Sequence, residues 1–334
     1  MRYCIYTIVL GVLFGLGFSV SAQLMPNLGG QRVGISALTF LKTEVSPRMM
    51  AMGGSQIALP GDAYAMQWNP GAITSLKGPT FSISNGLLTS GLQHSFAGVI
   101  LPNKKDGAWS MSATSLTGGE MKRRTEFQPE GTGETFYAGY VSTGVGYGQK
   151  LTEMFSCGVN LKYVGEYFDL YQSHTLVADL GFLYQTDFRD LKFAVTLANF
   201  GGNSRLQGDI TPSVFSNKAT ALDKYSVPAI FRMGFSLRPL KTIPGFLFHA
   251  QVDHPGDNAA NLRFGMEYNH KDLLFLRTGY RVNVKDQALP TAGIGLRTRV
   301  GKYPFTIEYA TDPHQRLGWY HRLGLSLTLF AETR

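Results

Sequence analysis

The 334-residue chain carries 31 basic and 23 acidic side chains, a formal net charge of +8, and its mean hydropathy is close to zero at −0.05. A basic balance can indicate nucleic-acid binding, but the sequence has no basic run and no nucleic-acid motif, so no nucleic-acid partner is expected. Past the N-terminal segment no apolar run approaches the length of a membrane-spanning helix.

The N-terminal segment predicts export. Arg2 precedes an apolar run over residues 5 to 18, and small residues follow before Gln23. This order is typical of a secretory signal peptide. We therefore expect residues 1–22 to be removed as a signal peptide, and we expect no lipid anchor because no cysteine follows the cleavage site.

The next segment shows neither a strand period nor a helix period. Residues 36 to 75 contain several pairs of turn-forming residues, which are Gly53-Gly54, Pro60-Gly61 and Asn69-Pro70-Gly71. Asp62 is placed to cap a short helix that runs toward Trp68. Because the alternating segments that follow require a barrel, we expect residues 23–76 to form a polar leader and a plug, or hatch, folded into the lumen.

From residue 77 to residue 330 the sequence alternates between apolar and polar residues with a period of two. Phe231, Met233 and Phe235, for example, alternate with polar or small residues. Such segments have one apolar face and one polar face, and strands can span a bilayer only as a closed barrel. The predicted strands cover residues 79–88, 91–102, 107–117, 135–149, 154–167, 173–186, 190–199, 229–239, 245–254, 260–270, 272–282, 289–299, 302–311 and 317–330.

The sequence therefore predicts an all-β transmembrane fold, an antiparallel outer-membrane β-barrel of about 14 strands over residues 77–330, with a C-terminal tail at residues 331–334. Two links between strands, 118–134 and 201–228, are long, polar and rich in glycine. Both follow odd-numbered strands, so they emerge on one side, and long loops of such barrels face outside. We expect partner contacts there, with candidate residues Lys122, Arg123, Arg124, Asn203 and Arg205.

If the apolar residues face lipid, the other face lines the lumen and carries many charges. The predicted lumen charges include Arg232, Arg263, Glu267, Arg277, Arg297 and Glu308. Three interpretations remain open: these arginines pair with plug carbonyls and with the acids Glu44 and Asp62, or they form an anion-selective channel, or they form a carboxylate site at the rim.

No catalytic chemistry is predicted. The seven histidines are scattered, no GxSxG or Walker motif is present, and the glycine run at 144–148 lies within a strand pattern. A metal site at His249, Asp253 and His254 is less favoured than a polar lumen and turn. We expect no catalytic residues, no metal ligands, no cofactor and no enzyme activity.

One stretch of the plug segment resembles a known family. The run Arg48-Met49-Met50-Ala51-Met52-Gly53-Gly54, followed by Ala58, Asp62-Ala63, Ala65 and Trp68-Asn69-Pro70, resembles the N-terminal signature of the PorV/PorQ family. These are outer-membrane barrels of Bacteroidetes, similar in fold to the FadL fatty-acid transporters, and the best-known members belong to the type IX secretion system. Gly71 stands where the family commonly has alanine.

The resemblance implies a fourteen-stranded, FadL-like barrel in the outer membrane of a Gram-negative, Bacteroidetes-like bacterium, in contact with its lipid and lipopolysaccharide. It also implies protein partners. PorV-type members receive the C-terminal signal domains of secreted cargo at the translocon, and PorQ-type members help to hold the surface attachment complex. The plug motif residues are expected to be structural, and these are Arg48, Gly53, Gly54, Asp62, Asn69 and Pro70.

Two alternatives remain. A FadL-like transporter of hydrophobic small molecules predicts an apolar pocket between plug and wall near Phe40, Leu41, Met49, Met50 and Met52, although these side chains are also suited to plain packing. The other alternative is an accessory barrel of a different outer-membrane complex, because fold analogy by itself does not settle function.

Overall fold

The computed structural model describes residues 36–329 except residues 170, 209–223, 241 and 288. The expected signal peptide, the polar leader and the C-terminal tail at 331–334 lie outside the described residues. Within them, no helix is long and apolar enough to cross a membrane.

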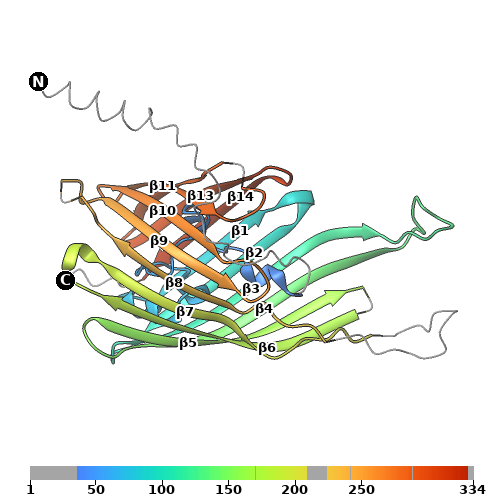
Figure 1. The fold of residues 1–334 in the computed structure, drawn as a ribbon, viewed down its shortest axis with the longest axis horizontal. Helices are drawn as coiled ribbons and strands as arrows, with labels where there is room; N and C mark the ends of the chain where they lie inside the picture. The colour runs from blue at the N-terminus through green and yellow to red at the C-terminus, as the bar shows by residue number, and fades with distance from the viewer. Residues whose placement is uncertain (1–35, 170, 209–223, 241, 288, 330–334) are drawn as a thin grey trace, which may run out of the picture.

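Fourteen strands form a closed antiparallel barrel in which each strand pairs with its neighbours in sequence and β1 pairs with β14 (Figure 1). The prediction of a fourteen-stranded barrel is confirmed. The strands are β1 (Thr80–Leu87), β2 (Gln93–Pro102), β3 (Gly107–Lys122), β4 (Thr135–Lys150), β5 (Phe155–Phe168), β6 (Tyr171–Gln185), β7 (Lys192–Gly201), β8 (Ile230–Leu237), β9 (Phe246–Pro255), β10 (Asn261–His270), β11 (Leu274–Val282), β12 (Thr291–Val300), β13 (Tyr303–His314) and β14 (Gly318–Thr328).

The alternation seen in the sequence separates two faces of the wall. In β8, Phe231, Met233 and Phe235 are exposed on the outside, whereas Arg232 and Ser236 are buried on the inside. Apolar side chains that face outward from a closed barrel are suited to lipid, and the polar set lines the lumen. The barrel is thus a membrane protein with a polar interior.

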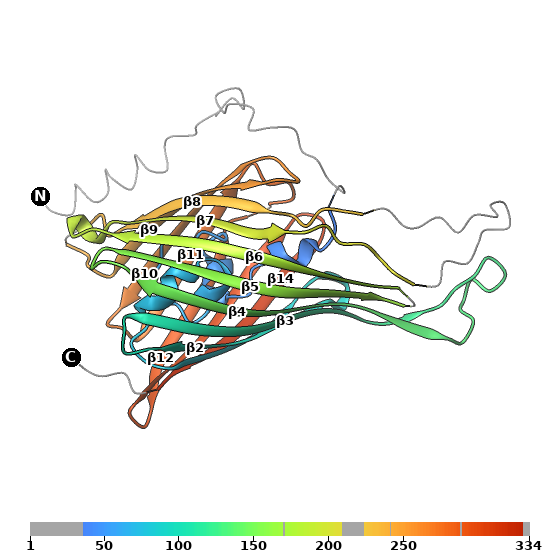
Figure 2. The ribbon, with the colours of Figure 1, turned by 90° about the horizontal axis from the view of Figure 1, so that it is seen from below.

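Strand length divides the barrel into two parts. β3 to β6 contain 14 to 16 residues each, and the other strands contain 8 to 12. At the long-loop end the hairpin of β3 and β4 projects beyond the rest of the barrel (Figure 2). Long loops face the outside of the cell in such barrels. The four long strands β3 to β6, here named the tall wall, therefore extend beyond the membrane on the extracellular side.

The third strand is longer than the sequence predicts. After an irregularity between Thr117 and Glu120, the β3–β4 ladder resumes and ends at the pair Lys122 and Thr135. The predicted start of the loop 118–134 is therefore wrong. Lys122 belongs to β3, and the loop begins at Arg123. A bulge interrupts the strict alternation while pairing continues, which is why the period of two ended early.

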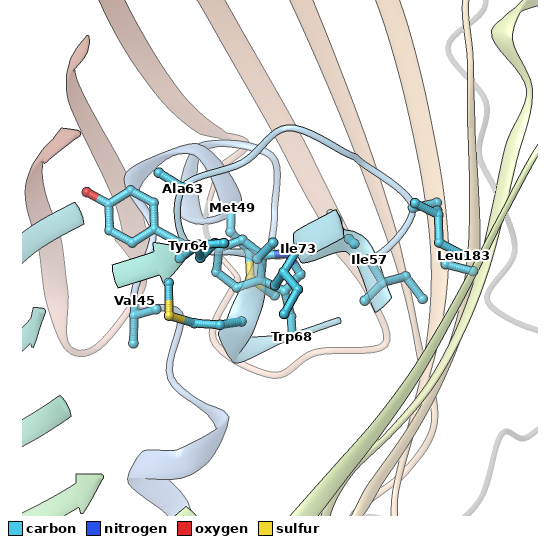
Figure 3. Packing of buried hydrophobic residues seen from close by; sticks show 14 of the residues in the cluster. Val45, Met49, Ile57, Ala63, Tyr64, Trp68, Ile73 and Leu183 are labelled. Atoms are coloured by element: carbon cyan, nitrogen blue, oxygen red, sulfur yellow. The ribbon is translucent and has the colours of Figure 1, made fainter. Parts of the chain in front are cut away.

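The segment ahead of β1 fills the lumen as a plug of short helical turns (Figures 1 and 2). Its elements are the 3₁₀ turn η2 (Thr39–Lys42), helix α2 (Pro47–Ala51), and the 3₁₀ turns η3 (Ala65–Gln67) and η4 (Pro70–Ser75). Its main hydrophobic cluster packs Met49, Tyr64, Trp68 and others against wall residues such as Leu183 (Figure 3). This plug supplies the barrel with its hydrophobic core.

The helix expected after Asp62 is a tight turn instead. The Asp62 carboxylate accepts a hydrogen bond from the backbone N–H of Tyr64 at 2.7 Å, and only the three residues of η3 are helical there. Short polar side chains of this kind favour local turns over helix.

Candidate functional site: the plug and its seat in the lumen

Helix α2 carries Arg48 toward the wall. Ser46 accepts a hydrogen bond from the backbone N–H of Met49 at 3.3 Å, and Pro47 occupies the first helical position, where its missing N–H costs nothing. This cap fixes the start of a five-residue helix. The helix therefore presents Arg48 in one direction, toward β10.

Arg48 joins a buried charge cluster shared by plug and wall. Its Nη2 and Nε donate to the Glu267 carboxylate at 2.7 and 2.8 Å, and its Nη1 lies 3.5 Å from Asp62. Arg277 contacts the same Glu267 at 2.6 Å and Glu308 at 2.7 Å. Two arginines and three carboxylates thus connect α2 with β10, β11 and β13.

A second cluster lies around Glu44. Arg263 donates to Glu44 at 2.8 Å and lies 3.0 Å from Asp253, and Asp253 is also 3.4 Å from Arg232. Burial alone would raise the pKa of the Glu44 carboxyl, but the guanidinium groups of Arg263 and Arg281 lower it to about 2. Glu44 therefore remains charged and bound to the wall at neutral pH.

Burial acts in opposite directions on the pKa values of the two plug groups in the first cluster, Arg48 and Asp62. Burial would lower the pKa of Arg48, but Glu267 and Asp62 raise it above its ordinary value. Burial raises the pKa of Asp62, with Arg48 acting against the shift. The charge of Arg48 is therefore secure, and Glu267 supplies its stronger contact.

Glycines of the wall make room for the Asn69-Pro70 turn. A Cβ at Gly148 would lie 2.7 Å from the Pro70 carbonyl oxygen, and one at Gly158 or Gly181 would overlap the turn itself. Asn69 also donates to the Ile57 and Phe182 carbonyls at 2.8 and 3.2 Å. The turn thus lies in a seat formed by β4, β5 and β6.

A matching seat holds the Gly53-Gly54 turn on the opposite wall. Both glycines have positive φ, 64° and 77°, a conformation that other residues resist. A Cβ at Gly53 would lie 2.9 Å from the Tyr280 nitrogen, and a Cβ at Gly279 would overlap the backbone at Met52. The Gly53 N–H donates to Thr291 at 3.0 Å. Backbone lies directly against backbone here.

All six plug motif residues therefore contact the wall or orient a group that does. Of the predicted lumen charges, Arg232, Arg263, Glu267, Arg277 and Glu308 lie in the two clusters. Arg297 lies apart: its guanidinium is 4.8 Å from the Phe275 ring centroid, and no described carboxylate lies within 4 Å of it.

The candidate loop residues lie at the extracellular end of the barrel, on two separate links. Arg123 donates to both oxygens of Asp169 at 2.7 Å and lies 3.4 Å from Glu134. Asn203 is exposed and Arg205 is half-buried, each just beyond β7. Arg124 is exposed. The rest of the long link, residues 209–223, lies outside the described residues.

Sequence reasoning missed a fully buried cation in the last strand. Arg322 of β14 is 1% exposed and donates to His94 Nδ1 at 2.8 Å and to the Val45 carbonyl at 3.3 Å. Its position between the outward-facing Trp319 and Leu323 places it on the polar face of the last strand, so the alternation could have identified it. The inward glycines were also missed, because a small residue on the polar face gives no pattern of its own.

The space beside the apolar residues of the plug is small. A cavity of about 30 Å³ lies beside Phe40, Leu41, Met49 and Trp68, and charged side chains such as Lys162 and Arg232 also line it. For comparison, an apolar cavity of ~150 Å³ binds benzene. The predicted apolar residues therefore pack against the wall, and the cavity beside them is too small for a hydrocarbon. Among the described residues, no group of three acids, histidines or cysteines is placed to hold a metal.

Comparison with known proteins gives structural neighbours only. No protein-family model matches the chain, and no curated sequence is significantly similar to it. The toluene transporter TbuX of Ralstonia pickettii superposes with a TM-score of 0.57 at 12% identity, over 84% of this chain and 96% of that one. The toluene transporter TodX of Pseudomonas putida gives 0.58 at 11%, over 85% and 98%. A FadL homologue of Pseudomonas aeruginosa gives 0.56 at 10%, over 90% and 99%.

The fold and the seated plug therefore define a class. The chain has the fold of FadL-like outer-membrane β-barrels, and the neighbours TbuX and TodX are described as toluene transporters. At identities of 10 to 12% the likeness establishes the fold.

Proposed function

We propose that this barrel is a protein-binding component of an outer-membrane secretion machinery, in which the tall wall of β3 to β6 is the contact surface. The observation that carries the proposal is the bracing of this wall. Arg123, just beyond β3, bonds to both oxygens of Asp169, beyond β5. The two projecting hairpins are thereby joined to each other above the membrane.

Other contacts support an ordered extracellular surface. Tyr225, on the link between β7 and β8, donates to Glu166 of β5 at 2.7 Å, and the backbone of Gln207 pairs with that of Gln172. At the far end of the wall, Phe127 is 93% exposed. A large apolar side chain on a braced hairpin is the kind of anchor that protein interfaces use.

The plug supports binding over conduction. Two charge clusters and two glycine seats hold it, and breaking a buried ion pair leaves a charge without its partner. The resemblance of its motif to PorV/PorQ proteins gives the finer proposal, which is a role in type IX secretion with cargo signal domains, the translocon or the attachment complex as partners.

The test is capture of partners in mild detergent, followed by mass spectrometry. A variant with residues 123–134 exchanged for a short Gly-Ser turn is compared with the native barrel, and both are checked for closed-barrel mobility on unheated gels. We expect cargo that shares a C-terminal domain, or a large translocon barrel, to accompany the native protein and not the variant. Equal capture by both proteins would sink the proposal.

Transport of hydrophobic small molecules is the second candidate, and the structural neighbours support it more directly than they support secretion. TbuX and TodX are toluene transporters by description. Since the cavity beside Phe40 and Trp68 is only about 30 Å³, passage of a hydrocarbon along this side of the plug requires the plug to move. Saturable binding of toluene or a fatty acid, quenching the fluorescence of Trp68, would favour transport; copurification with protein and no such binding would favour the first proposal.

A further inference from the structure

The short-turn end of the barrel, which faces the periplasm in such proteins, contains a cavity of about 330 Å³ between the plug and the wall. Its lining comes from β1, β11, β12, β13 and β14, from Arg48 of helix α2, and from the plug residues that lead into β1. It is about ten times larger than the cavity beside Trp68. Unlike that cavity, it has room for a small solute.

Basic groups dominate its lining. Four cations, Arg48, Lys77, Arg277 and Arg297, face two acids, Asp62 and Glu308. Both acids are already engaged, Asp62 by Arg48 and Glu308 by Arg277. Among the described residues, no carboxylate lies within 4 Å of Arg297 or Lys77. Two positive charges therefore remain available to a ligand.

The strand register places hydroxyl groups beside Arg297. Arg297 pairs with Thr306 across β12 and β13, and Thr306 pairs with Ser326 across β13 and β14. The three side chains form one row on the lumen face, and all three line the cavity. Within the described residues, neither hydroxyl donates to the protein. This leaves two free O–H donors next to a guanidinium.

Phe275 fixes the orientation of this guanidinium. Arg297 lies 4.8 Å and Arg277 lies 5.3 Å from the centroid of its ring. Stacking of a guanidinium on an aromatic face leaves its N–H groups free to donate in the plane. A planar fork with adjacent hydroxyls and an ammonium is a donor set suited to an oxyanion, because phosphate and carboxylate oxygens only accept hydrogen bonds from it.

We propose that this cavity binds a small periplasmic solute through a phosphate or carboxylate group, held by Arg297, Thr306, Ser326 and Lys77. The site is independent of the extracellular wall and of either proposed function. It differs from an open anion channel, because the charge clusters and the plug close the path beyond it. The ligand enters and leaves on the periplasmic side.

Equilibrium dialysis of the full-length barrel in nonionic detergent against radiolabelled inorganic phosphate, at low ionic strength, tests the site. We expect saturable binding near one equivalent. Arg297→Gln should weaken it by about tenfold or more, the loss expected for hydrogen bonds to a charged group, and Lys77→Gln should weaken it in the same direction. Competition by acetate or by a phosphate monoester then shows which oxyanion the site prefers.

Lys302→Gln is the matched control, because it removes the same charge from the neighbouring β12–β13 turn without altering the lining. This variant should bind phosphate within about twofold of the native barrel. Binding that never saturates, binding unchanged in Arg297→Gln, or an equal loss in Lys302→Gln would overturn the proposal. If Arg297→Gln does not form a closed barrel, the Lys77→Gln comparison decides, since Lys77 lies outside the strands.

Discussion

The guanidinium of Arg48 in the plug and the carboxylate of Glu267 in β10 share two hydrogen bonds, at 2.7 and 2.8 Å. They are 219 residues apart in sequence. Because Glu267 also accepts from Arg277, one wall carboxylate serves a plug cation and a wall cation. This sharing makes plug docking dependent on the integrity of the wall cluster.

Removing one partner of this pair should loosen the plug. Arg48→Met leaves Glu267 buried with a single cation, and we expect a loss of about 3–5 kcal/mol in docking free energy. The double variant Arg48→Met with Glu267→Gln should lose less than the sum of the two single changes. Urea titration monitored by Trp68 fluorescence, with Trp109 and Trp319 replaced by Phe, measures the docking free energy of each variant. Strictly additive losses would show that the two residues act independently.

The glycine seat should not tolerate a methyl group. Gly181→Ala would overlap Asn69 and approach Pro70 Cδ at 2.7 Å, and overpacking of this kind costs about 1–3 kcal/mol or more. We expect faster cleavage of the plug by protease while the barrel remains closed. Gly139→Ala is the control, since its nearest neighbour, the Leu116 carbonyl oxygen, lies at an ordinary 3.6 Å. Equal resistance of the plug to protease in the two variants would contradict a requirement for glycine at position 181.

Docking of the plug should depend on pH through Glu44. The folded pKa of Glu44 is about 2, below its ordinary value of 4.5, so the ionised form is favoured in the docked state. Its contribution is full above pH 4.5, falls as the pH drops toward 2, and amounts to about 3 kcal/mol. Trp68 fluorescence from pH 7 to pH 2 should report this loss. In Glu44→Gln the decline between pH 4.5 and pH 2 should be reduced, and a native-like decline would rule out Glu44 as its source.

Phe127 should matter for binding and not for folding. It is 93% exposed, so Phe127→Ser should change the free energy of unfolding by less than about 0.5 kcal/mol. We expect reduced partner capture at unchanged barrel stability. Phe188→Ser, at another exposed position on a short turn at the opposite end of the barrel, is the control and should leave capture intact. Unchanged capture in Phe127→Ser would remove this residue from the contact surface.

The sequence alone determined the barrel. A strand has a period of two, and a bilayer requires the apolar face outside and a closed ladder, so the alternation fixed the number of strands and placed residues such as Arg232 and Glu267 on the lumen side. The predicted strand end was wrong where the period was interrupted, as at the bulge before Lys122. Local propensity also indicated the turns at Gly53-Gly54 and Asn69-Pro70.

Only the tertiary structure decided which of these residues meet. Closure of the barrel brings β10 to the plug, so the pairing of Arg48 with Glu267 depends on the register of the wall and not on any local pattern. The same holds for the glycines that receive Pro70 and for the row of Arg297, Thr306 and Ser326. Contacts between segments 200 residues apart follow from strand register and packing, which a single sequence does not contain.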